Sequence, residues 1–127
     1  MDPLRLLIAD DHPLFRNGMR ALLSSVPDME VAGVATRGEE AIALAASLLP
    51  DVILMDLQMP GMSGIELQRH LATTGQRIPI VFVTAHPDQH VREEAMKSGA
   101  VCFLAKPFNE GDLLDGLKSS RKATNDE

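Results

Sequence analysis

The side chains of this sequence that could do chemistry come directly after apolar segments. Four such segments cover residues 4–9, 51–55, 80–83 and 101–105. They are followed, in the same order, by Asp10 with Asp11, by Asp56, by Thr84 and by Lys106. If the segments are strands of a parallel sheet, their carboxyl ends mark the place where ligands bind. We therefore expect these side chains to converge on one small pocket.

The three carboxylates of this expected pocket need a counter-charge, because like charges at close range repel strongly. Oxygen ligands suit a hard cation, which indicates Mg²⁺ as the cofactor. With a hydroxyl and a lysine added, the set could handle a phosphoryl group. The sequence has no Gly-rich loop of the P-loop or dinucleotide-binding type, which argues against tight binding of a whole nucleotide. The pattern favours an aspartate that itself carries a phosphoryl group.

Each of these residues also has a simpler interpretation. One aspartate of the Asp10-Asp11 pair could serve only as a helix N-cap, although a cap does not need two carboxylates. Asp56 precedes a loop rich in Pro and Gly and could be a turn residue. Thr84 and Lys106 would each be unremarkable alone. The argument for a site rests on the four positions together.

The histidines and methionines predict no site of their own. His12, His70, His86 and His90 have no ligand-like spacing with one another or with the one cysteine, so we expect solvated or capping residues. The methionines around Asp56 are expected to fill irregular gaps in the packing.

Composition limits the class of protein. The chain has 127 residues, 45% of them hydrophobic, and a net charge of −6. This length allows one domain with a real core, and the negative charge argues against a nucleic-acid surface. The N-terminal residues do not resemble a signal peptide, and no apolar stretch approaches the length of a membrane span. We expect a cytoplasmic protein without membrane contact.

Strand and helix patterns alternate five times along the chain. The second strand is expected at about 30–35, between helices that begin near Pro13 and Gly38. Further helices are expected before Gly75, over about 88–98 with Gly99 capping the end, and after Pro107. A frayed polar tail is expected from residue 121. This alternation predicts an α/β fold, a doubly wound five-stranded parallel sheet flanked by five helices, as in flavodoxin-like (βα)5 proteins.

At this point the sequence resembles a known family over nearly its full length. Four pieces carry the resemblance: IADDHPLFR at 8–16, DVILMDLQMPGMSG at 51–64, VTA at 83–85 and LAKPF at 104–108. In this order and spacing they are similar to the receiver domain of bacterial two-component response regulators. The opening piece is similar to N-terminal receivers of the NarL/FixJ type, which carry a C-terminal helix-turn-helix domain.

The resemblance implies a role for each acidic residue. Asp56 corresponds to the phosphoacceptor, which takes a phosphoryl group from a phosphohistidine on a sensor kinase. Asp10 and Asp11 correspond to the pair that positions Mg²⁺, and Gln58 would offer its backbone carbonyl to the same ion. A phosphorylation-controlled switch follows from this resemblance, and the only catalysis it implies is the chain's own phosphotransfer and autodephosphorylation.

The remaining motif residues are implied to stabilise and report the phosphoryl group. Thr84 and Lys106 would contact its oxygens. Phe103 stands at the position of the family's switch aromatic, on a face made by the fourth helix, the last strand and the fifth helix. A lysine that must turn inward before a helix-leading proline suggests a cis bond at Pro107.

The expected organisation is one receiver domain over 1–122, with 123–127 forming a tail or the start of a linker. The implied partners are a sensor histidine kinase or phosphotransfer protein, and a second receiver in a homodimer formed on phosphorylation. The sequence is consistent with a stand-alone receiver and with a receiver separated from its output domain. In the second case DNA would be contacted only through that domain, and the output would be transcriptional.

Two other classes fit the sequence less well. An aspartyl-nucleophile phosphatase would want a second carboxylate two residues after the nucleophile, where this chain has Gln58, and a cap domain to hold a substrate. A flavodoxin-like binding module would want hydroxyl- and Gly-rich loops and aromatic residues for a flavin. The chain has four Phe and no Trp or Tyr.

Overall fold

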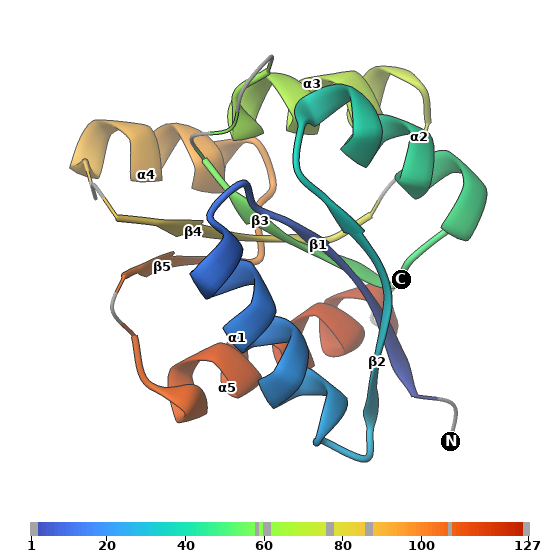
Figure 1. Cartoon of the computed structure of the whole chain (residues 1–127). Coiled ribbons are helices and arrows are strands. Elements are labelled where there is room, and N and C mark those ends of the chain that lie inside the picture. The colour runs from blue at the N-terminus through green and yellow to red at the C-terminus, as the bar shows by residue number, and fades with distance from the viewer. Residues whose placement is uncertain are drawn as a thin grey trace.

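Five parallel strands form one sheet with helices on both faces (Figure 1). The computed structural model describes residues 3–57, 59, 62–75, 78–85, 88–106 and 108–125. The strands lie in the order β2-β1-β3-β4-β5, and every neighbouring pair is parallel. The predicted doubly wound α/β fold is confirmed.

The elements follow the predicted order closely. The strands are β1 Leu4–Ala9, β2 Met29–Ala35, β3 Val52–Asp56, β4 Ile80–Thr84 and β5 Cys102–Ala105. The helices are α1 Pro13–Ser24, α2 Gly38–Leu48, α3 Gly64–Thr73, α4 Gln89–Lys97 and α5 Glu110–Asn125. The last helix is the main difference, because it continues through the segment after residue 120 for which a frayed tail was expected.

The sheet separates two apolar layers, because successive side chains of a strand point to opposite faces. Leu7 and Ala9 of β1 pack with α2, α3 and α4. Leu6 and Ile8 of the same strand pack with α1 and α5 on the other face. Figure 1 shows these two groups of helices on opposite sides of the sheet. Because β1, β3 and β4 are covered on both faces, these central strands are almost entirely apolar.

The parallel register brings two of the predicted acidic residues together at the carboxyl ends of neighbouring strands. Ala9 of β1 pairs with Met55 of β3, so the residues that follow them, Asp10 and Asp56, emerge side by side. Both are almost completely buried, at 1% and 2% exposure. Aspartate is rarely buried to this degree unless it is paired, which already marks this edge as a site.

Gly64 brings the start of α3 close to the end of β3. Its backbone N–H donates to the Leu57 carbonyl at 3.1 Å. A Cβ atom at Gly64 would lie 2.7 Å from Cε1 of Phe82 and 3.2 Å from Cα of Leu57, so only glycine fits without movement of the core. Ser63 then starts α3 with a capping box, in which its hydroxyl accepts from the Glu66 N–H.

Within the described part of the chain, no helix combines the length and the apolar character that crossing a membrane requires.

Candidate functional site

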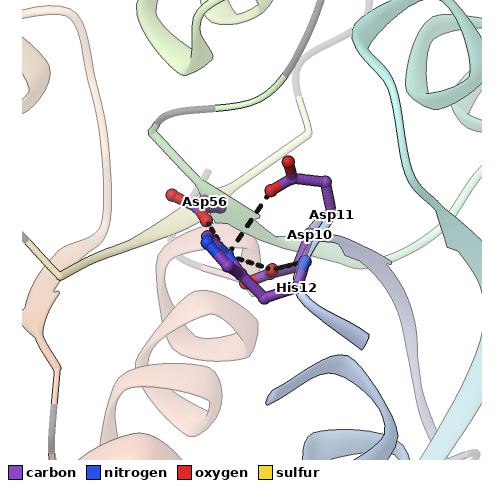
Figure 2. A group of neighbouring side chains, drawn as sticks. All are labelled: Asp10, Asp11, His12 and Asp56. Carbon is purple, nitrogen blue, oxygen red and sulfur yellow. Dashed lines mark hydrogen bonds and ion pairs between the residues drawn. The ribbon is translucent and has the colours of Figure 1, made fainter. Parts of the chain in front are cut away.

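The pocket is built by the ends of β1 and β3 and the start of α1. Figure 2 shows Asp10, Asp11 and Asp56 around the ring of His12, with dashed lines from the ring to each carboxylate. Each of these four residues offers one atom that could bind a metal ion, and the four atoms all lie within 4.8 Å of one another. The predicted convergence of the three carboxylates is therefore confirmed.

Both carboxylate oxygens of Asp10 accept hydrogen bonds. Its Oδ1 accepts a hydrogen bond from the His12 backbone N–H at 2.8 Å. Its Oδ2 accepts one from Nζ of Lys106 at 3.1 Å. The backbone N–H of Asp10 donates to the Ala35 carbonyl at 3.0 Å, which continues the β1–β2 ladder. Asp10 thus both ends the strand and fixes the groups around it.

Lys106 supplies the positive charge of the pocket. Its Nζ lies 3.1 Å from Oδ2 of Asp10 and 3.5 Å from Oδ2 of Asp56, and its side chain is only 13% exposed. The backbone N–H of Lys106 donates to the Thr84 carbonyl at 2.7 Å, which ties the lysine to the end of β4. A largely buried cation between two buried carboxylates offsets their repulsion.

An aromatic pair supports this lysine and was not foreseen. Nζ of Lys106 lies 3.8 Å from the centroid of the Phe15 ring, within the range of a cation–π contact. Phe15 packs edge-on against Phe108, with ring centroids 5.8 Å apart and planes at 88°. In the sequence, Phe15 is one of several apolar residues at helical spacing after the first strand, a pattern typical of core residues that gives no sign of a ring facing the pocket.

His12 is the second residue that sequence reasoning missed. Its Nδ1 lies 3.1 Å from Oδ1 of Asp10, 3.4 Å from Oδ1 of Asp11 and 3.2 Å from Oδ2 of Asp56. The expectation of a solvated or capping histidine is wrong in part. The residue does occupy the N-cap position of α1 and makes no side-chain cap bond there, but its ring faces the carboxylates.

The signal for His12 was its position rather than its spacing to other histidines. It follows Asp11 and precedes Pro13, which is the first residue of α1. A residue before proline is held in an extended conformation, and His12 has φ −90° and ψ 107°. This backbone turns the ring back toward the end of β1.

The other predicted site residues lie around the pocket or outside the described residues. Thr84 is buried at 1% exposure at the end of β4, the strand beside β3. Phe103 is half-buried and lines a groove between α4 and β5, together with Met96 and Ala105. The metal-binding carbonyl predicted at position 58 and the cis bond predicted at position 107 fall outside the described residues and stay predictions.

Two groups with shifted pKa values, Cys102 and Glu39, lie away from the pocket. Burial raises the pKa of the Cys102 thiol, which is half-buried in β5. The pKa of the exposed Glu39 is lowered mainly by a backbone hydrogen bond at the start of α2, and to a lesser extent by the hydrogen bond from Arg37. Neither shift bears on the chemistry of the carboxylates.

The donor set of the pocket fits a divalent cation. Asp10, Asp11 and Asp56 bring three carboxylates together from two chain segments, and the lysine offsets only one of their charges. Carboxylate oxygens are the ligands that Mg²⁺ prefers. Asp11, with a side chain 32% exposed, leaves the group open to solvent on one side.

The comparisons with known proteins agree with this geometry. Residues 6–118 match the family model described as response regulator receiver domain. The chain belongs to this family, and a receiver domain is a two-component signalling domain and not a conventional enzyme. Membership implies a histidine kinase as partner.

Individual relatives show the same relationship. The nitrate/nitrite response regulator protein NarL of Escherichia coli is 42% identical over 118 residues, which cover 91% of this chain and 54% of that protein. The transcriptional regulatory protein LiaR of Bacillus subtilis is 36% identical over 119 residues, which cover 94% of this chain and 56% of that protein. The chain spans about half the length of the curated relatives it matches.

A solved structure confirms the fold. The receiver domain of the putative response regulator NarL from Mycobacterium tuberculosis superimposes with a TM-score of 0.85 at 32% identity. The match covers 93% of this chain and 98% of that one. The five-stranded order 2-1-3-4-5 is thus that of a flavodoxin-like receiver.

Proposed function

We propose that this chain is a phosphorylation-controlled switch in which Asp56 accepts a phosphoryl group from a sensor histidine kinase. The observation that carries the proposal is the position of Asp56. It ends β3, the central strand of the sheet, and its Oδ2 lies 3.5 Å from Nζ of Lys106. A buried carboxylate beside a fixed cation suits a nucleophile whose product carries extra negative charge.

The contacts of the other two aspartates favour different roles for them. Asp10 uses one oxygen for the His12 N–H and the other for Lys106, so attack by either oxygen would break a bond that holds the pocket together. Asp11 is the more exposed one and lies at the rim. Both are better placed to hold a cation than to attack a phosphoryl donor.

Mg²⁺ is the proposed cofactor, held by Asp10, Asp11 and Asp56 with the backbone carbonyl of Gln58. When bound, this ion neutralises negative charge on the transferring phosphoryl group. Lys106 is proposed to contact a phosphoryl oxygen from the opposite side, as a charge-assisted hydrogen bond. Thr84 is proposed to contribute its hydroxyl, since its carbonyl already holds the backbone of Lys106.

The output is proposed to pass through the face made by α4, β5 and α5. Phe103 and Met96 line a groove of about 590 Å³ on this face, and Met96 is 42% exposed. Phosphorylation replaces the single negative charge of the Asp56 carboxylate by a phosphoryl group that carries about −1.5 to −2. Movement of Thr84 toward the new oxygens would vacate space beside β5, and Phe103 would turn inward to fill it. The groove would then change shape, and partner affinity would follow by population shift.

The proposed receiver unit covers 1–122, with 123–127 as a tail or the start of a linker. A second receiver is the proposed partner after phosphorylation, in a homodimer. The protein is proposed to be cytoplasmic, and its output to be transcriptional. This output is suggested by the similarity to the transcriptional regulatory protein LiaR. DNA would be bound by a domain outside this sequence.

Intact-mass spectrometry tests the central step. Incubation with acetyl phosphate and Mg²⁺ should add one phosphoryl group to the wild-type chain and none to Asp56→Asn. Asp51→Asn is the matched control. Asp51 is exposed and lies next to the opposite end of β3. Its carboxylate accepts a hydrogen bond from the Arg5 backbone N–H at 2.8 Å. Full labelling of Asp56→Asn would overturn the proposal.

A further inference from the structure

We infer that His12 gives the cation site a nitrogen donor, so that this chain binds divalent first-row transition-metal ions more tightly than an all-oxygen site would. The inference rests on the proposed function, because it assumes that the three carboxylates hold a cation. It adds a residue and a class of ion to that site. The observation that carries it is the place of His12 Nδ1 within the acidic group.

The distances suit shared coordination. Nδ1 of His12 lies 3.1, 3.4 and 3.2 Å from oxygens of Asp10, Asp11 and Asp56. Neighbouring ligands of an octahedral ion with bonds of about 2.1 Å are about 3 Å apart. The nitrogen is therefore at the spacing of an adjacent ligand from each of the three oxygens, and ligand atoms of the four residues all lie within 4.8 Å of one another.

The backbone holds the imidazole in this place. The His12 N–H donates to Oδ1 of Asp10 at 2.8 Å, and the His12 carbonyl accepts from the Arg16 N–H in the first turn of α1 at 2.8 Å. Pro13 restricts the same residue from the other side. Since the ring is 58% exposed, it covers the solvent side of the pocket, where an arriving ion would meet it.

The chemistry of the donor selects the class of ion. Imidazole nitrogen suits Co²⁺, Ni²⁺, Zn²⁺ and Fe²⁺, whereas Mg²⁺ keeps oxygen ligands and water. In the tautomer with the proton on Nε2, Nδ1 presents a lone pair to the carboxylate group. Removal of this nitrogen should then weaken binding of a transition-metal ion and leave Mg²⁺ binding nearly unchanged.

Two measurements on the full chain test this inference. Titration calorimetry with Co²⁺ and with Mg²⁺ compares wild type with His12→Phe, which keeps a ring and loses the donor. We expect about tenfold weaker Co²⁺ binding or more, and a change for Mg²⁺ of less than about twofold. His70→Asn, at an exposed histidine of α3, is the control and should change neither. Pulsed electron paramagnetic resonance of bound Mn²⁺ should show a directly coordinated ¹⁴N in wild type that is absent from His12→Phe.

The outcomes separate the competing explanations. If His12→Phe binds both ions more tightly and wild type shows no nitrogen coupling, the imidazole is a counter-ion that excludes cations, and the inference is wrong. Equal affinities for all variants with no coupling also overturn it. If wild type binds neither Mg²⁺ nor Co²⁺, the proposed cation site itself fails, which is a different result. The spectrum of wild type decides the question even if the variant does not fold.

Discussion

Nζ of Lys106 lies 3.8 Å above the ring of Phe15 while it contacts Asp10 and Asp56. The lysine follows the end of β5 and the ring lies in the first turn of α1. The contact therefore joins two segments that are far apart in the sequence. Phe108 packs edge-on against the same ring. The lysine is therefore held by an aromatic wall on one side and by carboxylates on the other.

Phe15→Leu should slow phosphorylation of Asp56 without unfolding the chain. Loss of a partly buried cation–π contact costs about 1 kcal/mol, which corresponds to about a fivefold lower rate if Lys106 then spends less time at the pocket. Stopped-flow or mass measurements with acetyl phosphate give the rate. Phe15→Trp keeps a π face and should retain most of it. Equal slowing in both variants, or none in Phe15→Leu, would contradict this role.

Asp11→Asn should weaken Mg²⁺ binding because one carboxylate ligand becomes a neutral amide. The same change relieves repulsion among the carboxylates, so the metal-free chain should melt at a higher temperature. Calorimetric titration and thermal unfolding in EDTA measure the two effects. Unchanged Mg²⁺ affinity would remove Asp11 from the proposed ligands.

Thr84→Ala should uncouple phosphorylation from the face of α4, β5 and α5. Asp56 keeps its nucleophile and Lys106, so the phosphoryl group can still be accepted, but the hydroxyl that would draw β4 toward it is absent. Hydrogen exchange with and without beryllofluoride should show a change in protection of α4 and α5 in wild type and a smaller one in the variant. No change in wild type would sink the proposed coupling.

Gly64→Ala should destabilise the fold by about 1–3 kcal/mol, because the new methyl group meets Phe82 and the Leu57 backbone. Gly18→Ala is the matched control. That glycine lies in α1 with no atom within 4 Å of an added Cβ, so the change should stabilise by about 0.5–1 kcal/mol. Denaturant unfolding measures both. If the two variants are equally stable, the close approach of Gly64 to Phe82 and Leu57 does not constrain this position.

The parts of the fold that depend on local patterns could be predicted. Apolar runs that end in Asp10, Asp56 and Thr84 predicted buried parallel strands, and the alternation with helices then determined which strand ends share an edge. Pro13 and Gly99 marked a helix start and a helix end because their backbone preferences are local: Pro13 is the first residue of α1, and Gly99, at φ +104°, follows the C-cap of α4.

The parts that depend on side-chain direction could not be predicted. The position of His12 between Asp11 and Pro13 is only a weak signal and Phe15 carries none, since a histidine before a helix and an aromatic residue on a helix are common. Their roles arise from the angle at which α1 leaves β1, which brings one ring to the carboxylates and the other to Lys106. Phe103 likewise fits the pattern of an apolar strand residue. The sequence does not show that its side chain is half-buried and lines the groove.

Chemical mapping of the phosphorylated residue tests the account most directly. Borohydride reduces an aspartyl phosphate to homoserine, and tandem mass spectrometry of the digested chain then identifies the position. After incubation with acetyl phosphate and Mg²⁺, we expect homoserine at residue 56 and at no other aspartate. Homoserine at residue 10, 11 or 51 in place of 56 would contradict the assignment of Asp56 as the phosphoacceptor.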